Sequence, residues 1–170
     1  MSDVLNENDR KDLLSRYIET PHLFGSEILG YDKLTEIHSQ WIRYVWYSKG
    51  DVTLQAHRYS YKTTSVVICG IILWLLFNSN TTILLLRKTF DASSEVMEAI
   101  QNHYTTNTKL QYFYSHVLGV DNIVGNVWNS KRMSLSTKTN ITVEPNLRVK
   151  GMNDRGKTCL LYTSPSPRDS

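Results

Sequence analysis

The chain has 170 residues, of which 41% are hydrophobic and 21% charged, and its formal net charge is +3. These values are typical of one globular domain with a real core, and so mild a charge says little about nucleic-acid binding. The polar, acidic first residues exclude a secretory signal. The two cysteines show neither pairing nor metal-ligand spacing, which favours a reduced, cytosolic setting.

Two amphipathic helices are predicted before residue 50. Residues 8–18 place apolar side chains on one side, and Pro21 ends the pattern. A second stripe begins near the capping candidates Asp32 and Thr35 and has helical spacing at Leu34, Ile37, Trp41 and Val45. We therefore expect residues 1–50 to form an N-terminal helical lead-in.

Residues 54–64 match a phosphate-binding loop in which the glycines are replaced. In the pattern G-x-x-x-x-G-K-[ST], backbone N–H groups surround the phosphates, the lysine neutralises them and the hydroxyl holds Mg²⁺. Lys62 and Thr63 occupy the two chemical positions, whereas Ala56 and Tyr61 stand where the glycines would be. The alternative is a basic turn with a solvated lysine, so the flanking segments must decide.

The segments around this loop fit a strand–loop–helix–strand unit. Residues 51–56 are β-prone, residues 65–77 form an apolar run that contains Cys69, and residues 81–86 form a second apolar strand. We expect the two strands to be parallel neighbours, joined by a helix over residues 62–77 in a right-handed crossover. The apolar run is shorter than the ~20 residues that a membrane span needs, so a buried helix is expected.

The remaining periodicity predicts two helices and then strands. Helices are expected over residues 91–104 and 108–118, the second closed by Gly119. From residue 126 the pattern becomes strand-like, at residues 127–129, 132–136 and 140–144. The five histidines have no metal-ligand spacing, so no metal site of histidines is expected.

The loop resembles the deviant Walker A motif of phage terminase large subunits, commonly A-P-R-G-x-G-K-[ST]. In this resemblance the loop arginine falls on Arg58, the lysine on Lys62 and the Mg²⁺ hydroxyl on Thr63. Tyr59 departs from the family, which usually has glycine there. The nucleotide-binding residues implied are Ala56, His57, Arg58, Tyr59, Ser60, Tyr61, Lys62, Thr63 and Thr64.

Two other segments resemble the same family. Residues 34–42 resemble the helix that leads into the motor domain. Residues 84–89 with Ala92 resemble the second strand and the polar motif after it, close to where related translocases meet the DNA backbone. Arg87, Lys88 and Thr89 are therefore the candidates for DNA contact.

The resemblance implies a partial P-loop NTPase fold of the α/β class, a parallel sheet flanked by helices. It implies the ATP-binding part of a viral DNA-packaging motor, which couples ATP hydrolysis to translocation of double-stranded DNA into a procapsid. Arg58 and Lys62 would be the catalytic residues, and ATP and Mg²⁺ the cofactors. The implied partners are double-stranded DNA, a portal protein, a small terminase subunit and further copies in a ring, in the cytoplasm of an infected bacterium and transiently at the portal.

A terminase also needs a Walker B acid and a water-orienting glutamate, which this sequence does not clearly supply. Glu144 follows a short β-prone run but has no second acid beside it. We expect residues 51–158 to be an incomplete ATPase domain whose acids and nuclease domain lie beyond it, in a truncated fragment without ATPase activity. Residues 159–170 resemble the translation of a sequencing adapter and are expected to be a non-native tail.

Two other functions remain open. A P-loop helicase or recombination ATPase would share the loop and the reaction class. A non-catalytic α/β interaction domain with a decayed loop would share only the fold. Nucleotide binding separates the second alternative from the packaging motor, and a nuclease domain after the motor separates the first.

Overall fold

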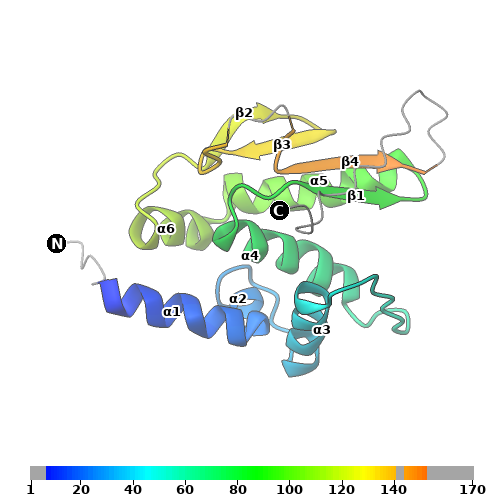
Figure 1. Ribbon diagram of the computed structural model, residues 1–170, viewed down its shortest axis with the longest axis horizontal. Helices are drawn as coiled ribbons and strands as arrows, with labels where there is room; N and C mark the ends of the chain where they lie inside the picture. The colour runs from blue at the N-terminus through cyan, green and yellow to red at the C-terminus, as the bar shows by residue number, and fades with distance from the viewer. Residues whose placement is uncertain (1–6, 141–143, 153–170) are drawn as a thin grey trace, which may run out of the picture.

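The computed structural model describes residues 7–140 and 144–152 of the chain. Figure 1 shows three layers: a sheet, a central layer of helices, and a layer of N-terminal helices on the far side from the sheet. The elements follow the order α1, α2, α3, η1, α4, β1, α5, α6, β2, β3, β4. The described part is thus an α/β fold with an open, mixed sheet.

The N-terminal layer contains α1 (Glu7–Glu19), α2 (Pro21–Glu27) and α3 (Glu36–Tyr47). The helices expected over residues 8–18 and from Thr35 are confirmed as α1 and α3. The short helix α2 was not expected, because Pro21 was interpreted only as the end of the first helix. Proline also fits the first turn of a new helix, where its missing N–H would have no partner anyway, and it occupies that position in α2.

The central helix has two parts, the π-helical segment η1 (Thr63–Cys69) and the α-helix α4 (Gly70–Phe77). The helix expected over residues 62–77 is therefore confirmed, although its first half has the wider π geometry. Most of α4 is buried on every side, as expected for a helix packed between two layers: Gly70, Ile71, Ile72, Leu73, Leu75 and Leu76. Cys69 is fully buried, as predicted, and burial raises the pKa of its thiol to about 12.

The sheet contains β1 (Ile83–Arg87), β2 (Val124–Trp128), β3 (Arg132–Leu135) and β4 (Leu147–Gly151), in the spatial order β1-β4-β3-β2. β1 and β4 are parallel and in register from Ile83–Leu147 to Arg87–Gly151, whereas the other two pairs are antiparallel. A wholly parallel sheet was expected, so this prediction is corrected to a mixed sheet. β4 was not predicted, although apolar Leu147 and Val149, whose side chains are buried, alternate in the sequence with Arg148 and Lys150.

The two helices after β1 agree with expectation. They are α5 (Phe90–Thr106), which packs on β1 and β4, and α6 (Thr108–Val117). The side chains of Thr89 and Asn107 accept hydrogen bonds from Ala92 N and Leu110 N, and so cap the two helices. Gly119 has φ +69, which suits a glycine that ends a helix.

The strand expected over residues 51–56 is absent, and this is the main correction to the fold. No described residue pairs its backbone with this segment, and the side chains alternate between exposed and half-buried. A β-prone sequence becomes a strand only beside a partner, because its N–H and C=O groups must be satisfied. The expected parallel pairing with residues 81–86 is also wrong, since β4 takes that place beside β1.

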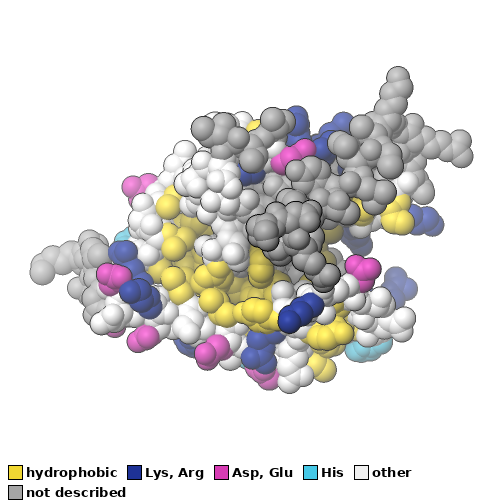
Figure 2. Space-filling model, in the orientation of Figure 1, with side chains coloured by type: hydrophobic (Ala, Val, Ile, Leu, Met, Phe, Trp, Pro, Cys, Tyr) yellow, Lys and Arg dark blue, Asp and Glu magenta, His cyan; other side chains and the backbone are white. Residues whose placement is uncertain are grey.

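One hydrophobic core joins the layers across the described residues. It runs from Tyr17 and Phe24 in the N-terminal helices, through η1–α4, to Met97 in α5 and Leu147 in β4. Figure 2 shows hydrophobic side chains gathered on the face where the central helix lies between the sheet and the N-terminal layer. No helix in the described residues is long and apolar enough to cross a membrane. The expected tail at residues 159–170 and the centre of the expected strand at 140–144 lie outside the described residues.

Candidate phosphate-binding site

The backbone of the loop adopts the conformation that glycine favours, although glycine is absent from it. Tyr59 has φ 70 and Tyr61 has φ 54, and they are the only non-glycine residues with positive φ in the described chain. For a residue with a side chain this conformation costs roughly 1–2 kcal/mol. The general phosphate-loop pattern has glycine at the position of Tyr61, and the resembled motif usually has glycine at that of Tyr59, so the loop has a glycine-type backbone with two tyrosines in it.

The described part of the chain offers no hydrogen-bond acceptor to the backbone N–H groups of the loop. Within the described residues, no hydrogen bond uses the N–H of any residue from Tyr59 to Thr64. The first N–H that is bonded belongs to Ser65, which donates to the carbonyl of Tyr61 at 2.8 Å. Successive free N–H groups in a turn and at the start of a helix form a concave site that suits an anion.

A hollow of about 620 Å³ lies against this loop. It is lined by His57, Arg58, Tyr59, Ser60, Tyr61, Lys62, Thr63, Thr64 and Arg87. Eight of the nine predicted nucleotide-binding residues therefore line one hollow. The ninth, Ala56, accepts a hydrogen bond through its carbonyl oxygen from Lys62 Nζ at 3.2 Å.

Three cationic side chains belong to this hollow. Lys62 is exposed, and its ammonium donates one of its three N–H groups to the Ala56 carbonyl. Two N–H groups are left that can bind a phosphate. The Arg58 guanidinium lies 5.3 Å from the centre of the Tyr59 ring, a cation–π contact on the surface of the loop. Arg87 is the last residue of β1 and donates from Nη1 to the carbonyl of Ala92 at 2.8 Å.

The position of Arg87 places the hollow at the carboxyl end of the parallel pair of strands. Figure 1 shows the tip of β1 on the same side of the molecule as the loop before η1. In open α/β sheets, ligands bind outside the carboxyl ends of the parallel strands. The site thus has the usual location, even though the strand before the loop is absent.

His38 was missed by sequence reasoning. It lies in α3, is 7% exposed, and its Nε2 is 3.1 Å from the carbonyl oxygen of Ser60, at the centre of the loop. Its sequence neighbourhood suggested only a helix that leads into the motor domain. The distance of 22 residues between His38 and Ser60 left no pattern that could have revealed their contact.

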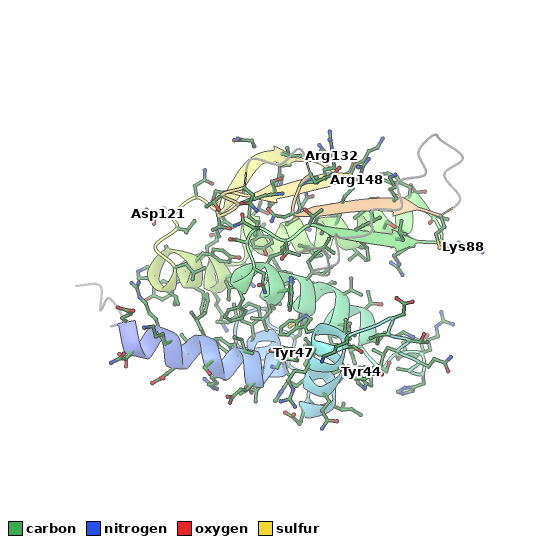
Figure 3. All side chains as sticks on the ribbon, in the orientation of Figure 1. Tyr44, Tyr47, Lys88, Asp121, Arg132 and Arg148 are labelled. Atoms are coloured by element: carbon green, nitrogen blue, oxygen red, sulfur yellow. The ribbon has the colours of Figure 1, made fainter. Side chains whose placement is uncertain are left out.

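The candidates for DNA contact are separated by the structure. Arg87 enters the hollow, whereas Thr89 caps α5 through its side chain. Lys88 is exposed, and Figure 3 shows it beyond the tip of β1, away from the helices. Of these three residues, Lys88 is the one whose side chain neither lines the hollow nor caps α5.

Glu144 does not reach this site. It precedes β4, whose first residue pairs with the first residue of β1, so it lies at the amino end of the strands. A strand of five residues separates the two ends by about 16 Å, at ~3.3 Å per residue. Glu144 also lies 3.6 Å from the Arg148 guanidinium. None of the described residues that line the hollow is Asp or Glu.

The donors present fit a nucleotide phosphate with its Mg²⁺ in part. Free N–H groups and cations suit the phosphate oxygens, and the half-buried Thr63 hydroxyl at the start of η1 suits one position on Mg²⁺. No group of three or more His, Cys, Asp or Glu side chains that could hold a metal ion occurs in residues 7–140 and 144–152.

Comparison with known proteins finds no match to this chain, whether among family models, curated proteins or solved structures.

Proposed function

We propose that the chain binds the phosphates of ATP at the loop of residues 56–64. The observation that carries this proposal is the pair of tyrosines with positive φ, Tyr59 and Tyr61. A solvated turn has no reason to hold two bulky residues in a conformation that costs each of them free energy. A loop that must present its N–H groups to phosphate does have such a reason.

Each side chain of the hollow has a role in this proposal. Lys62 places its ammonium against the charge of the β- and γ-phosphates, and the Thr63 hydroxyl binds Mg²⁺, which neutralises charge on the phosphates. Arg58 responds to the γ-phosphate. Arg87, assigned to DNA on sequence grounds, is reassigned to the phosphates because it lines the same hollow.

The larger function follows from the resemblance of residues 56–64 to terminase large subunits. We propose that the chain is the ATP-binding part of a motor that moves double-stranded DNA into a procapsid. The other partners proposed on the same ground are a portal protein, a small terminase subunit and further copies of the motor. Efficient hydrolysis needs an acid on Mg²⁺ and a residue that orients water. We therefore propose turnover only for a protein that supplies both groups at the hollow.

Phosphate binding is tested by isothermal titration calorimetry, in which ATP and Mg²⁺ are added to the chain and the affinity is measured. Lys62→Ala should weaken binding by at least tenfold, because the phosphates lose a charge-assisted contact. Lys88→Ala is the matched control, since it removes the same charge from an exposed position at the same end of the sheet. Equal affinities of the wild type and both variants would remove Lys62 from the site.

A non-catalytic interaction domain is the competing function, and the absence of a strand at residues 51–56 favours it. It predicts no binding of ATP by the wild type at millimolar concentration. Binding of ATP together with a preference for double-stranded over single-stranded DNA would favour the packaging motor over a helicase. A preference for single strands would favour the helicase.

A further inference from the structure

His38 makes two hydrogen bonds whose directions are fixed by their partners. The backbone N–H of Thr35 lies 2.9 Å from His38 Nδ1, and an N–H group can only donate. His38 Nδ1 therefore accepts and carries no proton. Nε2 lies 3.1 Å from the carbonyl oxygen of Ser60, which can only accept. The ring is thus neutral, with its single proton on Nε2 and donated to Ser60.

This contact is buried and belongs to the middle of the loop. His38 is 7% exposed and Ser60 is 9% exposed. Ser60 stands between Tyr59 and Tyr61, the two residues with positive φ. The His38 side chain therefore holds the Ser60 carbonyl in a direction that points towards α3.

The same peptide group links this carbonyl to a free N–H. In a trans peptide the C=O of one residue and the N–H of the next point in opposite directions, and no peptide bond in the described residues is cis. When the Ser60 carbonyl points to His38, the Tyr61 N–H must point away from α3. That N–H has no acceptor in the described part of the chain.

We propose that His38 is a positioning residue for the phosphate loop. Through the Ser60–Tyr61 peptide it fixes the Tyr61 N–H in the direction in which a phosphate oxygen is bound. This inference rests on the proposed function, because it assigns a role within the same site. It adds a contact from the helical lead-in, made by a residue 22 positions before Ser60, that no residue of the loop itself provides.

Two conservative variants separate this role from helix capping. The side-chain amide of His38→Gln can reach the position of Nε2 and donate to Ser60, and glutamine at this position of a capping box also accepts from the N-cap N–H, here that of Thr35. The side-chain oxygen of His38→Asn can reach the position of Nδ1 and accept from Thr35, but it cannot reach Ser60. Both variants therefore keep an acceptor for the Thr35 N–H, and only His38→Asn loses the hydrogen bond to Ser60.

The test is the affinity of the full chain for ATP with Mg²⁺, measured with the unfolding midpoint of each variant. His38→Asn should weaken binding about tenfold, the effect of losing one oriented hydrogen bond, and His38→Gln should stay within about twofold of the wild type. Wild-type affinity in His38→Asn, or a larger loss in His38→Gln, overturns the positioning role. No binding by the wild type instead overturns the proposed function, and this inference with it.

A second measurement keeps the proposal testable if His38→Asn does not fold. In the ¹⁵N-labelled wild type, the backbone N–H resonance of Tyr61 should shift when ATP and Mg²⁺ are added, because that N–H gains an acceptor. The resonance of Gly119, which is remote from the hollow in the sequence and does not line it, is the control. A Tyr61 resonance that stays in place while ATP binds overturns the proposal.

Discussion

The N-terminal helices and the sheet contact the phosphate loop in different ways. From the helical side, His38 in α3 reaches the backbone of Ser60 through a buried hydrogen bond. From the sheet side, Arg87 at the end of β1 lines the hollow with a charged side chain. The helices thus fix the path of the loop, and the sheet adds charge beside it. A loop held from the helical side keeps its shape without a strand in front of it.

Two β-prone segments flank the loop and its helix, and only one of them has become a strand. Residues 83–87 become β1 because β4 lies beside them over five paired residues. Residues 51–56 stay outside the sheet, and the Ala56 carbonyl accepts a hydrogen bond from Lys62 Nζ in the loop. Two β-prone segments therefore reach different structures because only one of them pairs with a neighbouring strand.

The largest effect on the free energy of unfolding is expected from a substitution in the sheet. Leu147 in β4 is fully buried and pairs with Ile83 and Met133. Leu147→Ala should lower the free energy of unfolding by about 2–5 kcal/mol, because it leaves a cavity in the hydrophobic core that the Leu147 side chain fills. Leu54→Ala, in the segment without a partner, should cost about 1 kcal/mol or less. Urea unfolding measures both, and equal losses would mean that residues 51–56 are as well packed as the sheet.

The second effect concerns the point where β4 meets α5. A Cβ at Gly151 would lie 2.4 Å from the backbone N of Phe90 and 2.8 Å from the backbone C of Thr89. Because both are backbone atoms, Gly151→Ala should destabilise the protein by about 1–3 kcal/mol. Gly50→Ala is the control before the loop, since nothing lies within 4 Å of its added Cβ. A Gly151→Ala protein with the wild-type unfolding midpoint would place β4 further from α5.

Local patterns predicted most helices and missed the long-range pairing. The periodic stripes at α1, α3, α5 and α6 identify their own buried faces, so their positions follow from the sequence. The partner of β1 does not, because β4 lies about sixty residues further along and its four-residue alternation is short. The strand at residues 51–56 was predicted from propensity alone, and propensity cannot supply a neighbour.

The sequence predicted the chemical groups of the candidate site, but it did not predict which residues outside the loop contact it. Lys62, Thr63 and Arg58 were identified from the order of residue types in one loop. The positive φ of Tyr61 was not predicted, because tyrosine itself gives no sign of that conformation. His38 and Arg87 come from other elements, and only the fold brings their side chains to the loop.

The third effect tests the loop itself. Tyr59→Gly should raise the free energy of unfolding by about 1 kcal/mol, because glycine adopts φ 70 without a steric penalty. Tyr59→Ala removes the same ring and its contact with Arg58 but keeps a Cβ, so it should not gain. The affinity for ATP should be maintained or improved in Tyr59→Gly. A tenfold loss of affinity would show that the Tyr59 ring itself contacts the nucleotide.

The smallest effect concerns a hydrogen bond between Tyr31, in the N-terminal layer, and His103, in α5. The Tyr31 hydroxyl lies 2.6 Å from His103 Nε2, and Asn107 Nδ2 lies 3.3 Å from His103 Nδ1. Asn107 Nδ2 also donates to the Ile28 carbonyl, and Asn107 Oδ1 accepts from Leu110 N, which fixes the amide with its nitrogen towards the ring. His103 Nδ1 is therefore an acceptor, and Nε2–H donates to Tyr31. A proton on Nδ1 would face the N–H of Asn107.

Because Nδ1 of His103 must stay unprotonated, we expect this hydrogen-bonded arrangement to be weakened by acid. Burial lowers the pKa of His103 below its ordinary value of 6.5, so the unfolded chain takes up the proton more readily than the folded one. The contribution of His103 to stability is complete above pH 6.5 and is lost as the pH falls through its lowered pKa. Between pH 7.5 and pH 5.5, the free energy of unfolding should therefore fall more steeply in the wild type than in His103→Gln, which cannot be protonated. Urea unfolding at several pH values measures the two slopes, and parallel slopes would show that the Tyr31–His103 contact is as stable with a charged ring as with a neutral one.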